Sequence, residues 1–401
     1  MNAPHRPDLD RTELRAELPT GVLDLRIDSG AAELDALLGF AARANAKRGF
    51  LFLSKVLGKH WPASPRAMLA VHARLAATVP AQRADGPDDG PVVFIAMAET
   101  AVGLGQGVFE AWLRAHPGRQ ALFLHTTRYR VGIGPLIEFE EAHSHAPRQF
   151  LHTPTEPGLR DLLLAARTLV LVDDEASTGN TFVNLAAACR RLNPGLARVH
   201  LATITNFMGR AASAALDERF GMPVTCGALV EGEFSFAQGA LPPDPGAAQR
   251  FAPDADRGAS TGFGRLGLAR ALRAPDALAA RLAGEFAPGS RVLVLGTGEF
   301  MHASTLLGAA LVGHGVDAVV QSTTRSPILT WGAVRHALRF ADNYGEGIAN
   351  YLYNVAPGQY DHVLACHETP PGPALRELAG LLGARLFHFL SEDHVEEVPV
   401  R

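Results

Sequence analysis

Short, uncharged apolar runs alternate with helical patterns along most of the chain, and this alternation limits the possible folds most strongly. The apolar runs in the first half are residues 91–97 (PVVFIAM), 121–125 (ALFLH), 168–172 (TLVLV), 198–205 (RVHLATIT) and 224–230. Helical patterns follow the first, third and fourth of them. Strands without polar residues are typical of parallel sheets, because helices cover both faces of such sheets. The alternation therefore predicts an α/β fold built on a buried parallel sheet.

A stretch rich in Gly, Pro and Ala divides this alternation in two. Residues 239–264 (GALPPDPGAAQRFAPDADRGASTGFG) have no periodicity, which is typical of a linker. Four more apolar runs and two helical patterns follow it: strands are expected at 291–295, 316–321, 362–365 and 386–390, and helices at 300–312 and 374–382. We therefore expect a first domain over residues 1–238, a linker over 239–264 and a smaller second α/β domain over 265–401.

The region before the first long strand has its own pattern. Residues 31–47 have helical apolar spacing, and residues 49–54 (GFLFLS) predict a short strand. A helix is expected from Ser64-Pro65 to Val79, because Ser suits the N-cap and Pro the first helical position.

Composition excludes several classes of protein. The chain has 37 Lys and Arg against 41 Asp and Glu, a net charge of −4, so we expect no nucleic-acid polymer as a partner. Its three cysteines form no C-x-x-C pair, so no disulfide framework, zinc knuckle or redox dithiol is expected. The chain lacks 18 consecutive uncharged apolar residues, and the first 19 residues lack an apolar h-region. These features predict a soluble, cytoplasmic protein without a membrane partner.

The segment 169–181 (LVLVDDEASTGNT) carries the clearest chemical signal. A buried strand ends in Asp173 and Asp174, and a loop of small residues then opens a helix. Ligands of open α/β sheets bind at such strand ends. Backbone N–H groups and hydroxyls of the loop could hold one phosphate at the positive end of the helix, and the two acids could accept hydrogen bonds from sugar hydroxyls; the loop residues are Ser177, Thr178, Gly179, Asn180 and Thr181. This pattern fits a ribose 5-phosphate. The alternative is a strand followed by two acids and an ordinary helix cap that bind no ligand.

This segment resembles the phosphoribosyl diphosphate (PRPP) signature of type I phosphoribosyltransferases, which has four apolar residues, two acids and a T-T-G-x-T-like loop. It departs from that pattern at Glu175, Ala176 and Ser177. The resemblance implies a type I phosphoribosyltransferase-like parallel sheet with an N-terminal hood. It also implies PRPP as co-substrate and Mg²⁺ as cofactor, with Asp173 and Asp174 holding the metal indirectly.

Two further segments resemble the side of the family's site that holds the diphosphate. Residues 95–105 (IAMAETAVGLG) place a turn after a strand, and the candidate loop residues are Ala98, Glu99, Thr100 and Ala101. Glu99 could instead cap a helix. The next strand is followed by Arg128, which resembles the family's cation beside the departing diphosphate. The planar fork of an Arg suits a diphosphate because it makes two charge-assisted bonds.

Residues 129–152 resemble the family's mobile catalytic loop. They are punctuated by Gly132, Gly134 and Pro135, and they carry a cluster of acids and histidines: Glu138, Glu140, Glu141, His143 and His145. Three interpretations remain open: a solvated loop, a catalytic lid to which His143 and His145 contribute, and a metal site. We expect the loop to be mobile and to order over bound diphosphate.

The hood is expected over the acceptor base. Residues 48–62 (RGFLFLSKVLGKHWP) offer Lys55, Lys59 and His60 as residues that meet the acceptor, although a surface helix with solvated lysines would also fit. The segment SKVLGKH is similar to one branch of the superfamily, the phosphoribosyltransferase-like proteins of bacterial tellurite-resistance and stress gene neighbourhoods.

The second domain contains QSTTRSPI, which resembles the domain named for its TRSP motif and found after phosphoribosyltransferase domains of that branch. Thr324, Arg325 and Ser326 follow one predicted strand, and Gly296, Thr297 and Gly298 follow another. Together these six residues predict an anion site, because neighbouring parallel strands bring their ends to one edge. We expect Arg325 to bind an anion and not to form a structural ion pair, since the nearest acids in sequence are remote. Ordinary tight turns are the alternative.

The combined pattern predicts transfer of ribose 5-phosphate from PRPP to a nitrogenous base, with release of magnesium diphosphate and formation of a nucleotide-like metabolite. Two other classes stay open: a non-catalytic PRPP or nucleotide sensor, and a scaffold that docks enzymes of the same operon. Arg128 and the long loop favour an enzyme. A homodimer, or enzymes of that operon, are the protein partners considered.

Overall fold

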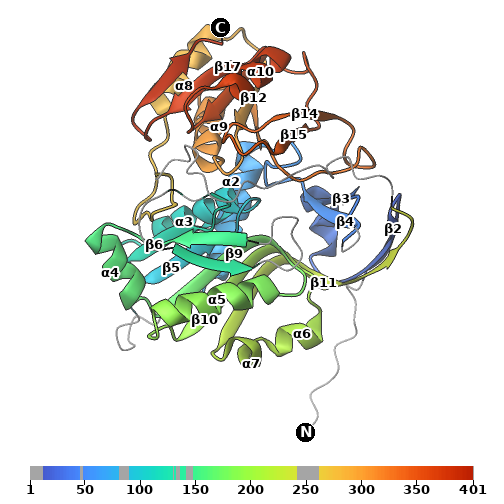
Figure 1. Cartoon of the computed structure of the whole chain (residues 1–401), viewed down its shortest axis with the longest axis vertical. Coiled ribbons are helices and arrows are strands. Elements are labelled where there is room, and N and C mark those ends of the chain that lie inside the picture. The colour runs from blue at the N-terminus through green and yellow to red at the C-terminus, as the bar shows by residue number, and fades with distance from the viewer. Residues whose placement is uncertain are drawn as a thin grey trace.

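The computed structural model describes residues 12–45, 48–80, 90–129, 131, 136–140, 148–241 and 262–400. The chain folds there into two α/β units, the first drawn in blue to green and the second in orange to red (Figure 1). The first unit holds a seven-stranded sheet and the second a five-stranded sheet. The predicted α/β architecture with a smaller second domain is therefore confirmed.

The first sheet has a parallel centre and an antiparallel edge, in the order β1-β2-β11-β10-β9-β5-β6. Strand β11 pairs in parallel with β10 through its first half and antiparallel with β2 through its second half. The strands are β1 (Thr12–Leu18), β2 (Gly21–Ser29), β5 (Val92–Ala96), β6 (Ala121–His125), β9 (Thr168–Ala176), β10 (Arg198–Asn206) and β11 (Val224–Gln238).

Helices cover both faces of this sheet, as its apolar strands require. Along β5, Val92 and Phe94 belong to one core, and Val93 and Ile95 to the other. The first core contains α2 (Pro65–Thr78) and α3 (Val102–Ala115), and the second contains α4 (Pro157–Ala165), α5 (Asn180–Leu192) and α7 (Leu216–Phe220), which follows α6 (Arg210–Ala214).

The helix predicted over residues 31–47 is wrong. In the described part of this segment, residues 31–45, the chain makes only η1 (Ala31–Glu33) and α1 (Leu34–Leu37), and then β3 (Leu38–Ala42), which pairs antiparallel with β4 (Phe50–Ser54). This hairpin is buried on two sides, because Phe52 packs into the core of the first sheet and Leu53 packs against the second domain. An element buried on both sides has no single apolar stripe from which helix and strand can be distinguished.

The second sheet has the order β13-β12-β16-β17-β18, parallel except for the last pair. Its helices α8 and α9 contribute to one core and α10 to another. The elements are α8 (Asp276–Glu285), β12 (Arg291–Gly296), α9 (His302–Gly313), β13 (Asp317–Ser322), β16 (His362–His367), α10 (Pro373–Leu382), β17 (Arg385–Phe389) and β18 (Val395–Val398), with a hairpin of β14 (Ala337–Ala341) and β15 (Ala349–Tyr353).

The two domains are joined by backbone as well as by side chains. Ala63 of the first domain exchanges two hydrogen bonds with Val320 on β13, of 2.9 and 2.8 Å. Helices α2 and α3 lie between the first sheet and α9 (Figure 1). There His302 of α9 lies 2.9 Å from Glu110 of α3, and its ring lies 6.5 Å from that of His72 on α2.

Part of the segment predicted as a mobile loop is regular structure. Strand β7 (Leu136–Glu140) pairs antiparallel with β8 (Arg148–His152), and Phe139 and Leu151 are buried. These two stretches are therefore held by regular backbone pairing. Gly132, Gly134, Pro135, Glu141, His143 and His145 lie outside the described residues, so the lid remains a prediction. Among the residues that the structure describes, no helix has the length and apolar character needed to cross a membrane.

Candidate functional site

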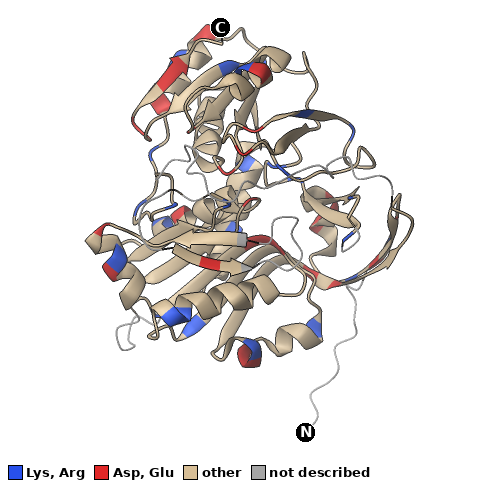
Figure 2. Cartoon of the chain, in the orientation of Figure 1, with Lys and Arg blue, Asp and Glu red and all other residues tan. Residues whose placement is uncertain are grey.

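One pocket lies where the carboxyl edge of the first sheet, the β3–β4 hood and the second domain meet. The sheet contributes the loop after β5, Arg128 after β6 and the end of β9. Figure 2 shows the acids of β9 as a red segment near the centre of the molecule, below the second domain. The lining residues used below are Arg43, Arg48 and Leu51 of the hood, Ala98, Glu99, Thr100, Arg128, Gln149, Asp173, Asp174, Glu175, Ser177, Thr178, Gly179 and Thr181 of the first domain, and Thr324, Arg325, Ser326, Pro327 and Ile348 of the second domain.

The predicted phosphate loop lies in this pocket at the start of α5. Gly179 has a φ of 73°, a left-handed conformation that favours glycine. Arg219 of α7 supports the loop, since its Nη2 donates to the carbonyl oxygen of Thr178 and to Oδ1 of Asn180, both at 2.8 Å. Asn180 itself is not part of the lining. The lining contains the other four predicted residues of the loop, Ser177, Thr178, Gly179 and Thr181.

Three acids stand in a row at the end of β9. The backbone N–H of Asp174 donates to Oδ1 of Asp173 at 2.9 Å, and Glu175 forms an ion pair with Arg48 of the hood. Burial, and then the neighbouring charge of Glu175, raises the pKa of Asp174 to about 6. A carboxyl in this state gains most from a ligand that supplies hydrogen-bond donors or positive charge.

The acids fit a magnesium ion that arrives with its ligand. No group of three or more His, Cys, Asp or Glu side chains among the described residues could hold a metal ion by itself. Mg²⁺ commonly keeps several waters and uses one or two carboxylates together with substrate phosphates. Asp173 and Asp174 match that donor set, because two carboxylates alone would leave most of the metal's positions to phosphate oxygens and water.

The loop after β5 is fixed by a short chain of buried hydrogen bonds. The N–H of Ala98 donates to Thr126 Oγ1 (2.7 Å), the Thr126 hydroxyl donates to Gln149 Oε1 (2.7 Å), and the Gln149 amide donates to the Ala98 carbonyl (3.2 Å). The Ala98–Glu99 peptide is cis. Glu99 is not a helix cap, because the N-cap of α3 is Ala101, which makes no side-chain cap bond. Ala98, Glu99 and Thr100 line the pocket, and Ala101 does not.

Glu99 is held by two cations. Lys59 Nζ lies 2.7 Å from its Oε1, and Arg325 Nε lies 3.3 Å from its Oε2. Burial would raise the pKa of Glu99, but the charges of Lys59 and Arg325 outweigh burial and lower it to about 2. Glu99 is therefore a carboxylate at neutral pH.

The predicted acceptor residues are outside the pocket, and this prediction is corrected. Lys59 is 1% exposed and donates to the Gly298 carbonyl at 2.6 Å as well as contacting Glu99. His60 is buried with its ring 6.0 Å from that of Tyr353, and Lys55 donates to the Asp35 carbonyl at 2.5 Å. These residues connect the hood to other parts of the fold. The hood residues that line the pocket are instead Arg43, Arg48 and Leu51.

The predicted anion site of the second domain is not a separate site. Thr324, Arg325 and Ser326 line the pocket of the first domain. The other half of the predicted site, residues 296–298, does not line the pocket. Its polar groups bond to the end of the neighbouring strand: the Gly298 N–H donates to Thr323 Oγ1, and Ser322 Oγ donates to the Gly298 carbonyl, both at 2.9 Å. The expectation that Arg325 has no carboxylate partner is wrong, because it contacts Glu99 of the first domain and Glu346 of its own domain.

Two family models match the chain. Residues 37–233 match the family model described as "Phosphoribosyl transferase", and residues 262–384 match the one described as "TRSP domain C terminus to PRTase_2". The chain is a phosphoribosyltransferase with a TRSP domain. We refer below to its phosphoribosyltransferase domain and its TRSP domain. A comparison with curated proteins gives no match.

Solved structures similar to the chain include three adenine phosphoribosyltransferases. The enzyme from Giardia lamblia, complexed with 9-deazaadenine, is 16% identical, with 50% of this chain and 96% of that chain covered and a TM-score of 0.32. The enzyme from Trypanosoma brucei, in complex with AMP, pyrophosphate and ribose-5-phosphate, is 13% identical over 49% and 78%, with a TM-score of 0.33. The enzyme from Saccharomyces cerevisiae is 13% identical over 49% and 97%, with a TM-score of 0.31.

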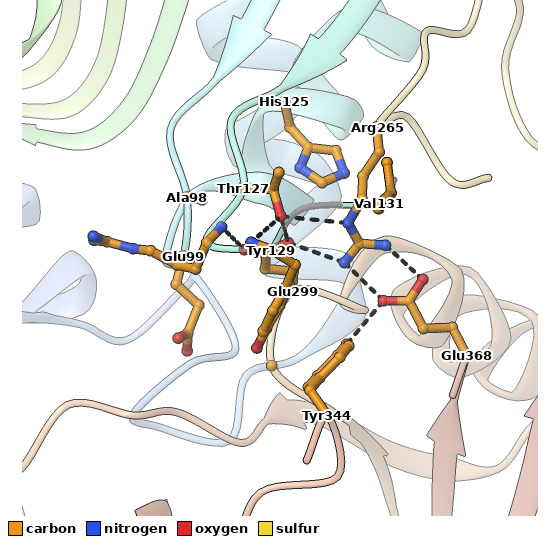
Figure 3. Close-up of polar contacts among 12 residues, drawn as sticks. Ala98, Glu99, His125, Thr127, Tyr129, Val131, Arg265, Glu299, Tyr344 and Glu368 are labelled. Carbon is orange, nitrogen blue, oxygen red and sulfur yellow. Dashed lines mark hydrogen bonds and ion pairs between the residues drawn. The ribbon is translucent and has the colours of Figure 1, made fainter. Parts of the chain in front are cut away.

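The TRSP domain also contacts the phosphoribosyltransferase domain through a buried polar cluster, which the sequence did not predict (Figure 3). Glu299 accepts hydrogen bonds from the Thr127 hydroxyl (2.7 Å) and the Arg128 N–H (2.8 Å). Arg265 donates to Glu299 at 2.9 Å and to Glu368 at 2.6 and 2.8 Å, and Tyr344 donates to Glu368 at 2.8 Å. No local pattern could have revealed this cluster, because its members are far apart in sequence.

Proposed function

We propose that the pocket binds PRPP and transfers its ribose 5-phosphate to a nitrogen of a base-like acceptor, with release of magnesium diphosphate. The observation that carries the proposal is that a phosphate loop, a pair of acids and a cationic corner line one pocket. They match the three polar parts of PRPP, which are the 5-phosphate, the ribose hydroxyls and the diphosphate. The family of the first domain supports the same class of reaction.

Each part of PRPP has a proposed partner. The loop Ser177–Thr181 holds the 5-phosphate through N–H groups and hydroxyls at the start of α5, where the helix end favours negative charge. Asp173 and Asp174 accept hydrogen bonds from the ribose hydroxyls. Arg128 and the loop of Ala98, Glu99 and Thr100 border the diphosphate. Magnesium, when bound with PRPP, supplies positive charge to the diphosphate oxygens.

The reaction needs no protein nucleophile. The bond from C1 of the ribose to the diphosphate oxygen breaks, and its electron pair leaves with the diphosphate. The lone pair of the acceptor nitrogen forms the new C1–N bond, and the proton of that nitrogen passes to solvent. The site's part is to hold the reactants in line and to stabilise the departing charge. The reverse reaction, in which diphosphate splits a nucleotide, uses the same contacts.

The acceptor is proposed to lie between the hood and the TRSP domain. Leu51, Pro327 and Ile348 offer apolar surface to a planar ring, and Arg43 and Arg48 offer hydrogen-bond donors to its edge. This assignment replaces Lys55, Lys59 and His60. The resemblance of SKVLGKH and of the TRSP motif supports a nucleotide-like product in a bacterial tellurite-resistance or stress system, made in the cytoplasm, with enzymes of the same operon as partners.

Calorimetric titration with magnesium PRPP tests the site. Wild type is expected to bind, and Asp161→Asn, a change in an exposed acid of α4, is expected to bind equally. A panel of candidate bases with PRPP, read as diphosphate release, then identifies the acceptor. A protein that binds no PRPP would remove the proposal. A protein that binds PRPP but releases diphosphate with none of the bases would instead support the non-catalytic PRPP sensor.

A further inference from the structure

Arg325 of the TRSP domain occupies the diphosphate corner of the pocket. It lines the pocket together with Glu99, Thr100 and Arg128, the residues placed above beside the diphosphate. Its ion-pair partner from the other domain is Glu99, which lies on the loop after β5. The motif that names the second domain therefore belongs spatially to the site of the first.

The guanidinium of Arg325 is fixed on three sides. Nε contacts Glu99 Oε2 at 3.3 Å, and Nη1 contacts Glu346 Oε2 at 2.5 Å. The group also lies over the ring of Tyr129, 5.0 Å from its centroid, and that ring stacks on Tyr344 with centroids 4.2 Å apart. A guanidinium held in this way has its plane and direction set before any ligand binds.

The third nitrogen of Arg325, Nη2, has no partner among the described residues. Nη2 is buried and makes no hydrogen bond in the described part of the chain, although the side chain as a whole is 13% exposed and lines the pocket. A buried donor left unsatisfied is unfavourable, and a charged one more so. An acceptor oxygen from a ligand in the pocket would satisfy it.

The charge of the corner suits a diphosphate. Of the side chains that line this corner, Arg325 and Arg128 are cations and Glu99 is an anion, so the lining of the corner carries a net positive charge. Glu99, and Glu346 outside the lining, orient Arg325. A structural ion pair alone would explain the contacts to the acids, but it would leave Nη2, a buried donor on a residue that lines the pocket, unsatisfied.

We propose that Arg325 binds the diphosphate group of PRPP and remains on it as it departs, so that the two domains form one active site. This inference rests on the proposed function. It assigns the TRSP motif a direct role in transfer, beside Arg128, and it makes the second domain necessary for catalysis.

Ligands with and without a diphosphate test the assignment. Calorimetry on the full chain measures the affinity of magnesium PRPP, magnesium diphosphate and ribose 5-phosphate for wild type and Arg325→Gln. We expect the variant to lose about 10-fold or more in affinity for PRPP and diphosphate, because a charge-assisted hydrogen bond is lost. Ribose 5-phosphate should bind within about 2-fold of wild type. Arg339→Gln, on an exposed position of β14, is the matched control and should change none of the three.

Two outcomes overturn the inference. Either Arg325→Gln binds diphosphate as wild type does, or it weakens all three ligands equally together with a lower melting temperature, as a structural ion pair predicts. Should Arg325→Gln fail to fold, Arg325→Lys replaces it, because it keeps the charge and loses the fork; a selective loss for diphosphate ligands supports the inference, and unchanged affinities overturn it. Wild type that binds neither PRPP nor diphosphate contradicts the proposed function itself, which separates the two failures.

Discussion

The two sheets of this phosphoribosyltransferase present the same kind of edge and use it differently. At the carboxyl edge of the first sheet, the residues after β5, β6 and β9 border a pocket. At the corresponding edge of the second sheet, Glu299 after β12 and Glu368 after β16 both accept hydrogen bonds from Arg265, and Glu299 also accepts one from Thr127 of the first domain. Ligands of open α/β sheets bind at carboxyl edges, but this rule does not say which of two edges can take a ligand. The edge that can do so is the one whose polar groups border a pocket and are not all bonded to other protein groups.

This difference implies that substitutions at the two edges have different effects. At the first edge, and at the turn after β13 that carries Arg325, they should reduce ligand binding and leave stability nearly unchanged. At the ends of β12 and β16 they should reduce stability or the docking of the domains. The four predictions below test this division, beginning with the largest effect.

The largest effect is expected for Arg265→Ala. Arg265 is 1% exposed and is the partner of both Glu299 and Glu368, so its removal leaves two buried carboxylates without their cation. Breaking a buried ion pair in this way typically costs about 3 to 5 kcal/mol. Urea unfolding measures the loss. Arg270→Ala is the matched control, because Arg270 is exposed and its ion pair with Glu392 should contribute about 1 kcal/mol or less. Equal, small losses for both variants would break the division between the edges.

Asp174→Asn should affect binding and not stability. The change keeps the shape of the side chain but removes the charge that we propose to order ribose hydroxyls, and we expect PRPP binding to weaken by about 1 to 3 kcal/mol. Calorimetry gives the affinity, and a thermal melt of the same sample gives the stability. A melting temperature that falls by many degrees with unchanged affinity would place Asp174 among the structural residues instead.

Acid should weaken the junction between the domains. Burial, and next the charge of His302, lowers the pKa of His72 to about 3, below the usual value of about 6.5. The unfolded chain therefore takes up a proton between these two values and the folded chain does not, so the stability is present above about pH 6.5 and is lost as the pH falls toward 3. At pH 5 this one group should cost about 2 kcal/mol. Unfolding of wild type and His72→Gln at pH 7.5 and pH 5 measures it, and a parallel pH dependence of the two proteins would contradict it.

The smallest effect is expected on the outer side of the TRSP domain. Gly284 lies in α8, is exposed, and would have nothing within 4 Å of an added Cβ. Gly284→Ala should therefore stabilise the protein by about 0.5 to 1 kcal/mol, because Ala loses less backbone entropy in a helix. PRPP affinity should stay the same. A change in affinity would mean that the stability of the second domain alone tunes the site.

The central elements could be predicted from sequence because their patterns are local. The run at 168–172 and the loop at 177–181 gave a strand and the start of a helix, and β9 and α5 lie there. The strand continues to Ala176 through three acids, which no apolar pattern could indicate. The strands β1 and β2 were missed although β2 has the alternation of a half-buried strand, with Leu23, Leu25 and Ile27 buried between charged residues.

The architecture of the site could be predicted only in part. The phosphate loop and the two acids are contiguous in sequence, so their proximity needs no tertiary information. The meeting of Glu99 with Arg325 joins residues 226 positions apart, and it depends on how the second domain packs on the first. Lys59 illustrates the same limit. A lysine in a sequence is expected to be solvated or to bind a ligand, and its contact with Glu99 forms only through the tertiary fold.

The bonds of Glu299 to Thr127 and Arg128 also have a consequence for synthesis of the protein. The ribosome makes β5, β6 and β9 well before it reaches Glu299, and domains generally fold as units in the order in which they emerge. The nascent first domain can therefore bury its cores while the segment that carries Arg128 still waits for its partner. We expect a growing chain to complete the corner around Arg128 last, only after translation has passed the segment that carries Glu299.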